Sequence, residues 1–159
     1  MSRAWIGLGS NLDAPRRQIE GAFAELEALP GTRLEGRSSL YSSSPMGPAD
    51  QPDYVNAVAL LETDLAPLVL LDALQAIEAR HGRVRERHWG PRTLDLDLLL
   101  YDEKVMATPR LTLPHPGIGE RDFVLLPLME IAGDIEIPGW GRASRLLAQC
   151  PARTARRIE

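Results

Sequence analysis

The sequence predicts an α+β fold built on an antiparallel sheet, with helices packed mainly on one sheet face. Short runs of alternating apolar residues end at glycine or proline turns, and two longer stretches carry apolar residues every three or four positions. These runs follow one another as strand, helix, strand, strand, helix, strand, before a more elaborate C-terminal part. A chain of 159 residues suits one domain, over residues 1–159.

The first strand is predicted over residues 3–9, and Gly9-Ser10-Asn11 ends it. One face of this strand carries Ala4, Ile6 and Leu8. Asp13 can cap the helix that follows, and Pro15 is tolerated in its first turn. Apolar residues then recur at spacings of four, three and three, at Ile19, Phe23, Leu26 and Leu29. This stripe predicts a helix with one buried face, closed by Pro30-Gly31.

Two more strands are predicted over residues 33–41 and 54–63. Residues 42–53, between them, contain three prolines and a glycine, so we expect a long irregular loop, a kind that is usually functional or disordered. A second helix is predicted over residues 65–80, with Asp64 as its cap and Gly82 in the left-handed position after its end. Its inward face carries Leu70, Leu74 and Ile77.

The C-terminal part predicts smaller elements after the strand that begins at Asp95. They are a hairpin or connector over 104–113, a helix over 123–131, a small strand over 135–137 and a last helix over 142–149. Residues 153–157 are expected to be solvated and frayed. The first six elements have the order of the split βαβ, ferredoxin-like arrangement, which leaves the second sheet face available for a site.

Charge and composition exclude several classes of protein. The net charge of −4 argues against broad, sequence-independent nucleic-acid binding. No stretch approaches the roughly 20 apolar residues that span a membrane, and the N-terminus looks like a strand rather than a signal peptide. We therefore expect a cytoplasmic protein, and nothing in the sequence demands a partner, so we expect a monomer. The one cysteine, Cys150, is interpreted as a plain apolar residue.

Two aspartates in a leucine-rich strand are the strongest chemical signal. Side chains alternate along a strand, so Asp95 and Asp97 share one face with Cα atoms roughly 6.6 to 6.8 Å apart. The opposite face carries Leu94, Leu96 and Leu98. Two neighbouring carboxylates repel each other unless a cation lies between them, and Mg²⁺ prefers such oxygen ligands. A site is favoured over an exposed strand face, because buried acids are costly unless they are paired or bind metal.

An arginine-rich segment precedes this strand. It contains Arg83, Arg85, Arg87, Trp89 and Arg92. Arginine matches phosphate oxygens, and an indole can stack on a base or another heteroaromatic ring. The segment and the aspartates together indicate Mg-nucleotide chemistry. A solvated charge run is the alternative, since arginine replaces lysine almost throughout this chain.

Two further polar sets are candidates for binding. The first is a phosphate-friendly cluster of Arg110, Thr112, His115 and Arg121, in which two prolines flank the histidine. The second is Gln75 and Glu78, which share one face of the second predicted helix. On spacing alone, an exposed polar face is the favoured interpretation of this pair.

Common nucleotide-binding motifs are missing. There is no phosphate-binding loop of the G-x-x-x-x-G-K-[ST] type, because the one lysine lies far from such a loop. Gly7-Leu8-Gly9 has no third glycine at position 12, so the dinucleotide-binding fingerprint is incomplete. Gly9-Ser10 also lies too far before Asp95 for a polymerase-like nucleotidyltransferase.

Several segments resemble the 6-hydroxymethyl-7,8-dihydropterin pyrophosphokinase family, in order and over nearly the whole chain. They are Gly9-Ser10-Asn11-Leu12, Asp50-Gln51-Pro52-Asp53-Tyr54-Val55-Asn56, Gly82-Arg83-Val84-Arg85, Trp89-Gly90-Pro91-Arg92-Thr93-Leu94-Asp95-Leu96-Asp97, Pro114-His115-Pro116 and Arg121-Asp122-Phe123-Val124-Leu125. The resemblance implies transfer of the β,γ-pyrophosphoryl unit of ATP to the pterin hydroxymethyl group, with release of AMP, in folate biosynthesis.

The resemblance also implies roles for individual residues. Asp95 and Asp97 would hold two Mg²⁺ ions with ATP, and the catalytic set is Arg83, Arg92, Asp95 and Asp97. The implied ATP-binding residues are Gln75, Glu78, Arg85, Trp89, Arg92, Leu98, Arg110, Thr112, His115 and Arg121. The implied pterin-binding residues are Ser43, Ser44, Pro45, Met46, Tyr54, Asn56, Trp89, Asp95 and Phe123. In this set Tyr54 and Phe123 hold the flat ring and Asn56 reads its edge.

Two other functions share the predicted fold. Another Mg-dependent nucleotidyl or phosphoryl transferase would keep the aspartates without using Tyr54, Asn56 and Phe123 together. A ferredoxin-like RNA-binding module would need exposed aromatics and a basic sheet, whereas this strand carries two acids that repel phosphate. The expected partners are therefore the small molecules ATP and 6-hydroxymethyl-7,8-dihydropterin, with no nucleic acid and no membrane.

Overall fold

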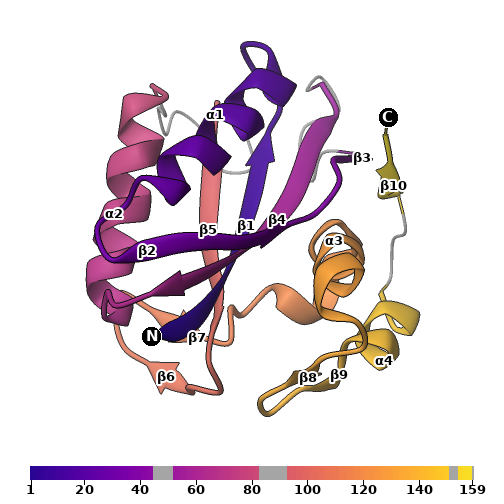
Figure 1. The fold of residues 1–159 in the computed structure, drawn as a ribbon. Helices are drawn as coiled ribbons and strands as arrows, with labels where there is room; N and C mark the ends of the chain where they lie inside the picture. Colours follow the sequence, from indigo (N-terminus) through magenta and orange to yellow (C-terminus); the bar gives the residue numbers. More distant parts are fainter. Residues whose placement is uncertain (45–51, 83–92, 151–153, 159) are drawn as a thin grey trace.

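A computed structural model describes residues 1–44, 52–82, 93–150 and 154–158. Within these residues the main sheet has six strands, all antiparallel to their neighbours, in the order β10-β3-β4-β1-β5, with β2 also paired to β4 (Figure 1). The strands are β1 (Ser2–Ser10), β2 (Thr32–Arg37), β3 (Tyr41–Ser43), β4 (Tyr54–Thr63), β5 (Asp95–Tyr101) and β10 (Arg156–Arg157). This order and the element sequence confirm the predicted α+β, ferredoxin-like fold.

Helices α1 (Pro15–Glu27) and α2 (Pro67–Arg80) cover one face of the sheet (Figure 1). Both predicted apolar stripes are confirmed. The buried helix residues are Ile19, Phe23 and Leu26 of α1 and Leu70, Leu74 and Ile77 of α2. They pack against Ala4, Ile6 and Leu8 of β1 in the first core cluster. Gly82, with φ +74°, follows α2 in the expected left-handed conformation.

The opposite face is partly covered as well, which corrects the expectation that helices pack mainly on one face. Helices α3 (Asp122–Ala132) and α4 (Ala143–Ala148) form a second core cluster with this face. Trp5, Val58 and Leu60 supply its sheet side. The leucine-rich segment of α3 drives this packing, since its apolar residues need a second surface to bury them.

The smaller elements are β6 (Met106–Ala107), β7 (Thr112–Leu113), a 3₁₀ turn η1 (Ile118–Glu120), β8 (Glu136–Ile137) and β9 (Gly141–Arg142).

Both predicted helix caps are wrong. The N-cap residues are Ala14 and Ala66, and neither makes a side-chain cap hydrogen bond. A proline follows each of them at the helix start. Proline lacks an N–H and already has helical φ, so these starts depend less on an acceptor from Asp13 or Asp64.

The predicted strand over residues 33–41 is divided into β2 and β3. At the break, the Ser38 N–H donates to the Val58 carbonyl at 2.9 Å, and the Val58 N–H donates to Ser38 Oγ at 2.9 Å. This reciprocal contact lets the chain pair first with the C-terminal half of β4 and then with its N-terminal half.

The C-terminal segment is not frayed, in contrast to the sequence prediction. Arg156 and Arg157 form β10, which pairs with Ser42 and Tyr41 of β3 (Figure 1). The Ile158 N–H donates to the Leu40 carbonyl at 2.9 Å. Backbone pairing requires no apolar side chains, so the hydropathy pattern gave no indication of it.

None of the helices in the described part of the chain has the length and apolar character that a membrane span requires.

Candidate active site

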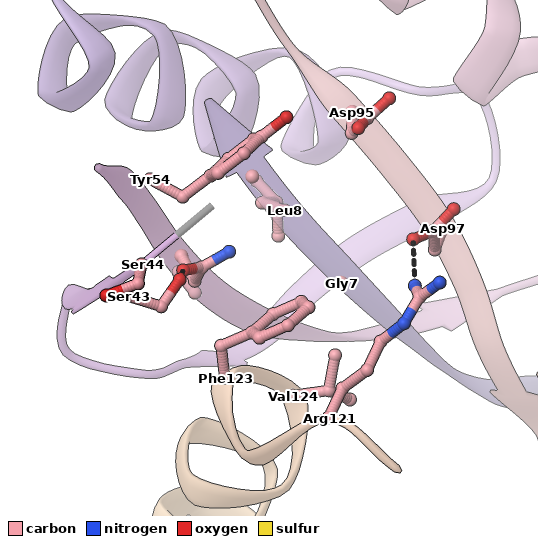
Figure 2. A pocket seen from close by; sticks show the side chains of 13 residues that line it. Gly7, Leu8, Ser43, Ser44, Tyr54, Asp95, Asp97, Arg121, Phe123 and Val124 are labelled. Carbon is pink, nitrogen blue, oxygen red and sulfur yellow. Dashed lines mark hydrogen bonds and ion pairs between the residues drawn. The ribbon is translucent and has the colours of Figure 1, made fainter. Parts of the chain in front are cut away.

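A pocket opens on the second sheet face, between the sheet and the N-terminal end of α3 (Figure 2). Its lining comes from β1, β3, β4, β5 and α3. The lining residues are Gly7, Leu8, Gly9, Ser43, Ser44, Tyr54, Asn56, Ala57, Asp95, Asp97, Arg121, Phe123 and Val124. Helices α3 and α4 cover only part of this face, and the pocket occupies the part next to them.

The aspartate pair lies along one side of the pocket. Asp95 and Asp97 point to the pocket face, while Leu96 and Leu98 are buried in the core under α1 and α2, as strand alternation predicts. In the sheet register, Asp95 is opposite Gly9 and Asp97 is opposite Gly7. The two glycines leave the floor beside the carboxylates without side chains, which makes room for a ligand.

Two basic side chains, Arg121 and His115, approach Asp97. Arg121 Nη1 lies 3.9 Å from Asp97 Oδ2, and His115 Nε2 lies 3.7 Å from Asp97 Oδ1 (Figure 2 shows the arginine contact). The Gly117 N–H donates to His115 Nδ1 at 3.0 Å, so the ring proton belongs on Nε2, facing the carboxylate. Burial lowers the pKa of His115, with Arg121 adding to the effect and Asp97 opposing it. A neutral Nε2–H donor therefore faces Asp97 at neutral pH.

The oxygen donors at this edge fit a hard divalent cation. Across the described ranges, no group of three or more His, Cys, Asp or Glu side chains is arranged to hold a metal. Two carboxylates alone are characteristic of Mg²⁺ sites, in which water and substrate phosphates complete the coordination. Asp95 and Asp97 are therefore the residues that could hold such an ion.

Two aromatic rings form opposite sides of the pocket. Figure 2 shows Tyr54, at the start of β4, facing across the opening from Phe123 of α3. Asn56 also lines the pocket and is 4% exposed. Ser43 Oγ donates to Asn56 Oδ1 at 2.6 Å, which directs the amide NH₂ away from Ser43. The arrangement suits a flat heteroaromatic ring with hydrogen-bonding groups on its edge.

Glu78 has a structural contact that its sequence pattern did not indicate. It is 7% exposed, and its Oε2 accepts a hydrogen bond from the Leu96 N–H at 2.8 Å. The favoured interpretation of an exposed polar face is therefore wrong for Glu78, although Gln75 is exposed. Glu78 satisfies a backbone donor on β5, the outer strand of the sheet.

Four more described residues of the predicted ATP-binding set are absent from the pocket lining: Gln75, Leu98, Arg110 and Thr112. Arg110 donates to Asp72 Oδ1 at 2.5 Å and to Gln75 Oε1 at 3.4 Å, beside α2. Thr112 is exposed on β7, and the Leu98 side chain belongs to the first core cluster. Of the predicted ATP set, Arg121 lines the pocket and His115 approaches it through Asp97.

Six residues of the predicted sites lie outside the described part of the chain. They are Arg83, Arg85, Trp89 and Arg92 of the arginine-rich segment and Pro45 and Met46 of the first loop. The described predicted pterin residues, by contrast, all line the pocket. They are Ser43, Ser44, Tyr54, Asn56, Asp95 and Phe123.

The end of β1 contacts the residues that flank both of these segments, and the sequence interpretation missed this role. Ser10 and Asn11 are buried. Ser10 Oγ donates to the Thr93 carbonyl at 2.5 Å, and Asn11 Nδ2 donates to the Pro52 carbonyl at 3.0 Å. Polar side chains directly after a strand were the available signal, but their distant partners are not visible in the sequence. The floor glycines Gly7 and Gly9 were missed too, because a missing side chain has no chemical signature.

Solved structures of HPPK-DHPS proteins have a similar fold. One is an HPPK-DHPS in complex with substrates, with TM-score 0.75, 11% identity and 98% of this chain covered. Another is wild-type Plasmodium falciparum HPPK-DHPS with pteroate, with TM-score 0.73, 13% identity and 92% of this chain covered. The chain spans 46% and 42% of those two proteins. At these identities the likeness shows the fold alone.

Sequence relatives are much closer. The 2-amino-4-hydroxy-6-hydroxymethyldihydropteridine pyrophosphokinase of Pseudomonas aeruginosa is 52% identical over 158 residues, which covers 99% of this chain and 98% of the relative. Its Haemophilus influenzae namesake is 51% identical over 149 residues, covering 94% and 93%. A folic acid synthesis protein of Schizosaccharomyces pombe is 40% identical over 135 residues, which is 85% of this chain and 18% of that protein.

A family model also matches the part of the chain that contains the pocket. It matches residues 5–133, which include every described lining residue of the pocket. The aspartate pair, the aromatic rings and the glycine floor therefore all lie inside the matched region. On this match and these relatives, the chain belongs to the 7,8-dihydro-6-hydroxymethylpterin-pyrophosphokinase family.

Proposed function

We propose that this chain transfers pyrophosphate from ATP to 6-hydroxymethyl-7,8-dihydropterin, giving AMP and the pterin diphosphate, in folate biosynthesis. Family membership supports the reaction. One structural observation carries the assignment to this pocket: two carboxylates and two facing aromatic rings line the same small cavity. An acceptor ring held between the aromatics would have its substituent directed toward the groups that handle phosphate.

The pterin binds between Tyr54 and Phe123 in this proposal. Stacking against both rings buries the faces of the heterocycle. Asn56 reads the ring edge, with its carbonyl oxygen engaged by Ser43 and its NH₂ directed to the ligand. Ser43 thereby selects which end of the amide the substrate meets.

Asp95 and Asp97 would hold Mg²⁺ together with the ATP phosphates, and two ions are expected there. Bound ions would supply charge neutralisation at the phosphates and orientation of the attacking hydroxyl. The donor chemistry described above supports this, because both carboxylates face the same cavity beside an open glycine floor. Phosphoryl-type transfer asks the protein chiefly for positioning and charge stabilisation.

Arg121 and His115 bind phosphate oxygens next to the aspartates. Both lie within 4 Å of Asp97 now, so a nucleotide at this edge would meet them directly. A neutral imidazole donates one hydrogen bond through Nε2, and the guanidinium adds positive charge. Arg83 and Arg92 remain the proposed catalytic arginines, and Gln75, Glu78, Arg85, Trp89, Leu98, Arg110 and Thr112 the further nucleotide contacts.

The finer statements about partners and location are also proposals. The chain acts as a monomer in the cytoplasm, where ATP is available, on two small molecules and without nucleic acid or membrane. The pocket supports the monomer, because one chain supplies all of its described lining. Size-exclusion chromatography with light scattering tests it, and a stable dimer would overturn it.

Nucleotide products test the proposed reaction. The enzyme is incubated with Mg-ATP, with and without the pterin, and AMP is separated from ADP. Pterin-dependent AMP supports pyrophosphoryl transfer. Pterin-dependent ADP would indicate γ-phosphoryl transfer instead, and no turnover would contradict the proposal and favour a binding module.

A further inference from the structure

The C-terminal strand lies outside the region that the family model matches. The match ends at residue 133, whereas β10 begins at Arg156. Nevertheless β10 is part of the main sheet, where it extends the edge beyond β3 next to the N-terminal end of α3 (Figure 1). Residues 154–158 therefore lie beside two elements that line the pocket.

Two successive residues of this segment contact two different segments beside the pocket. Thr154 Oγ1 accepts a hydrogen bond from the Ser44 N–H at 3.2 Å. The Ala155 N–H donates to Asp122 Oδ2 at 2.9 Å. Ser44 itself lines the pocket, and Asp122 lies directly between the lining residues Arg121 and Phe123. The segment thus joins the end of β3 to the first turn of α3.

Asp122 is suited to hold this connection rigidly. It is 4% exposed, and a buried carboxylate requires hydrogen-bond donors. The hydrogen bond from the Ala155 N–H satisfies that need and fixes the first turn of α3. Phe123 projects from this turn into the pocket (Figure 2). On the other side, Ser44 is adjacent to Ser43, which orients Asn56.

We propose that Asp122 and residues 154–158 are positioning elements for the pterin pocket, fixing the separation between the Ser43–Asn56 side and Phe123. This inference rests on the proposed function, because it assumes that the pterin binds between these sides. None of residues 154–158 lines the pocket, so we expect none of them to touch the substrate. Their effect is expected on pterin affinity, with little effect on ATP affinity.

Substitution of Asp122 tests the connection. Asp122→Ala removes the acceptor, whereas Asp122→Asn keeps a side-chain oxygen for the Ala155 N–H. We expect Asp122→Ala to raise the KM for pterin by about tenfold, as for loss of one hydrogen bond to a charged group. The KM for ATP should stay near the wild-type value, and Asp122→Asn should restore most of the pterin affinity.

A second pair of variants approaches the other contact and avoids the buried carboxylate. Thr154→Val removes the acceptor for the Ser44 N–H at nearly constant volume, and Thr154→Ser retains it. Thr154→Val should raise the KM for pterin severalfold while Thr154→Ser does not. This pair keeps the inference testable even where Asp122→Ala does not fold.

Glu130→Gln is the matched structural control. Glu130 also joins α3 to β3, because its Oε1 accepts a hydrogen bond from Tyr41 Oη at 2.7 Å, but it lies eight residues further along α3 than Asp122. The Glu130→Gln variant should have a lower Tm than the wild type and an unchanged KM for pterin. Lowered Tm with unchanged pterin KM in Asp122→Ala and Thr154→Val would overturn the inference. Absence of pterin-dependent AMP formation by the wild-type enzyme would instead overturn the proposed function.

Discussion

Asp97 is placed to bind ligands but contributes little to the stability of the fold. Its side chain is 40% exposed and lies near His115 and Arg121 at distances of 3.7 and 3.9 Å. Partly exposed polar and charged contacts of this length add little to stability. The value of Asp97 to the protein is therefore expected in the bound state, where its oxygens meet the cation and the nucleotide.

Asp97→Asn should separate turnover from folding. We expect turnover to fall by roughly 100-fold or more, since even outer-shell partners of a metal reach such losses. The Tm should change little. AMP formation and thermal unfolding measure the two effects, and near-normal turnover with Mg²⁺ would exclude Asp97 as a metal ligand.

Gly9 illustrates a residue whose contribution is empty space. A Cβ at this position would lie 3.2 Å from Asn56 Nδ2, tighter than ordinary contact. Gly9→Ala should displace the Asn56 amide and raise the KM for pterin by roughly tenfold or more, the effect of a misplaced methyl-sized group in a pocket. Gly36→Ala is the control, because nothing lies within 4 Å of its added Cβ. Equal pterin KM values in both variants would contradict the assigned floor.

At the scale of elements, helices and strands with a regular apolar pattern were predicted well from the sequence. Strand breaks and pairings that depend on distant contacts were predicted poorly. The bounds of β4 agree with the predicted range of residues 54–63, which holds a continuous apolar run, Ala57 to Leu61, that is buried throughout. The break at Ser38 depends on a contact with Val58, twenty positions away. β10 depends on backbone pairing alone, which leaves no apolar signature. Contacts between distant segments therefore account for both errors.

The contact of α3 with β3 should make stability depend on pH. Burial opposes ionisation of Glu130, but hydrogen bonds from Tyr41 and Ser39 outweigh it and hold the pKa of Glu130 below 4.5. Burial, with Glu130 nearby, raises the pKa of Tyr41 to about 12. A depressed carboxyl pKa stabilises the fold above the unfolded value, and this contribution is lost as the pH falls through the folded value.

Urea unfolding of the wild type and of Glu130→Gln checks this dependence. The wild type should lose stability between about pH 6 and pH 3 more steeply than the variant. The difference should be at most about 1 kcal/mol, because Glu130 is exposed and solvent screens it. Parallel pH profiles would show that Glu130 ionisation does not contribute.

At the scale of the whole molecule, one sheet separates two apolar clusters from each other. Phe23 and Ile6 belong to the cluster under α1 and α2, whereas Trp5 and Leu128 belong to the one under α3 and α4. The predicted stripes identified the first cluster. The second was underestimated, because short C-terminal elements bury their apolar residues only once they meet the sheet. The site was predictable where strand periodicity and residue chemistry coincide, as at Asp95 and Asp97.

Apolar packing rather than metal should maintain this architecture. In the part of the chain that the structure describes, no group of three or more His, Cys, Asp or Glu side chains could hold a metal ion. EDTA should therefore abolish AMP formation while leaving Tm in the absence of nucleotide unchanged, and added Mg²⁺ should restore turnover. A large fall in Tm with EDTA alone would contradict this separation.

Ser10 and Asn11 give the fold a capacity for evolutionary change. They fix the Thr93 and Pro52 carbonyls, one beside each of two long connections, against the end of the same central strand. Insertions between residues 44 and 52, or between 82 and 93, could then accumulate without moving the pocket floor. Descendants of such a chain can vary the length of these connections independently while inheriting the same aspartate pair and glycine floor.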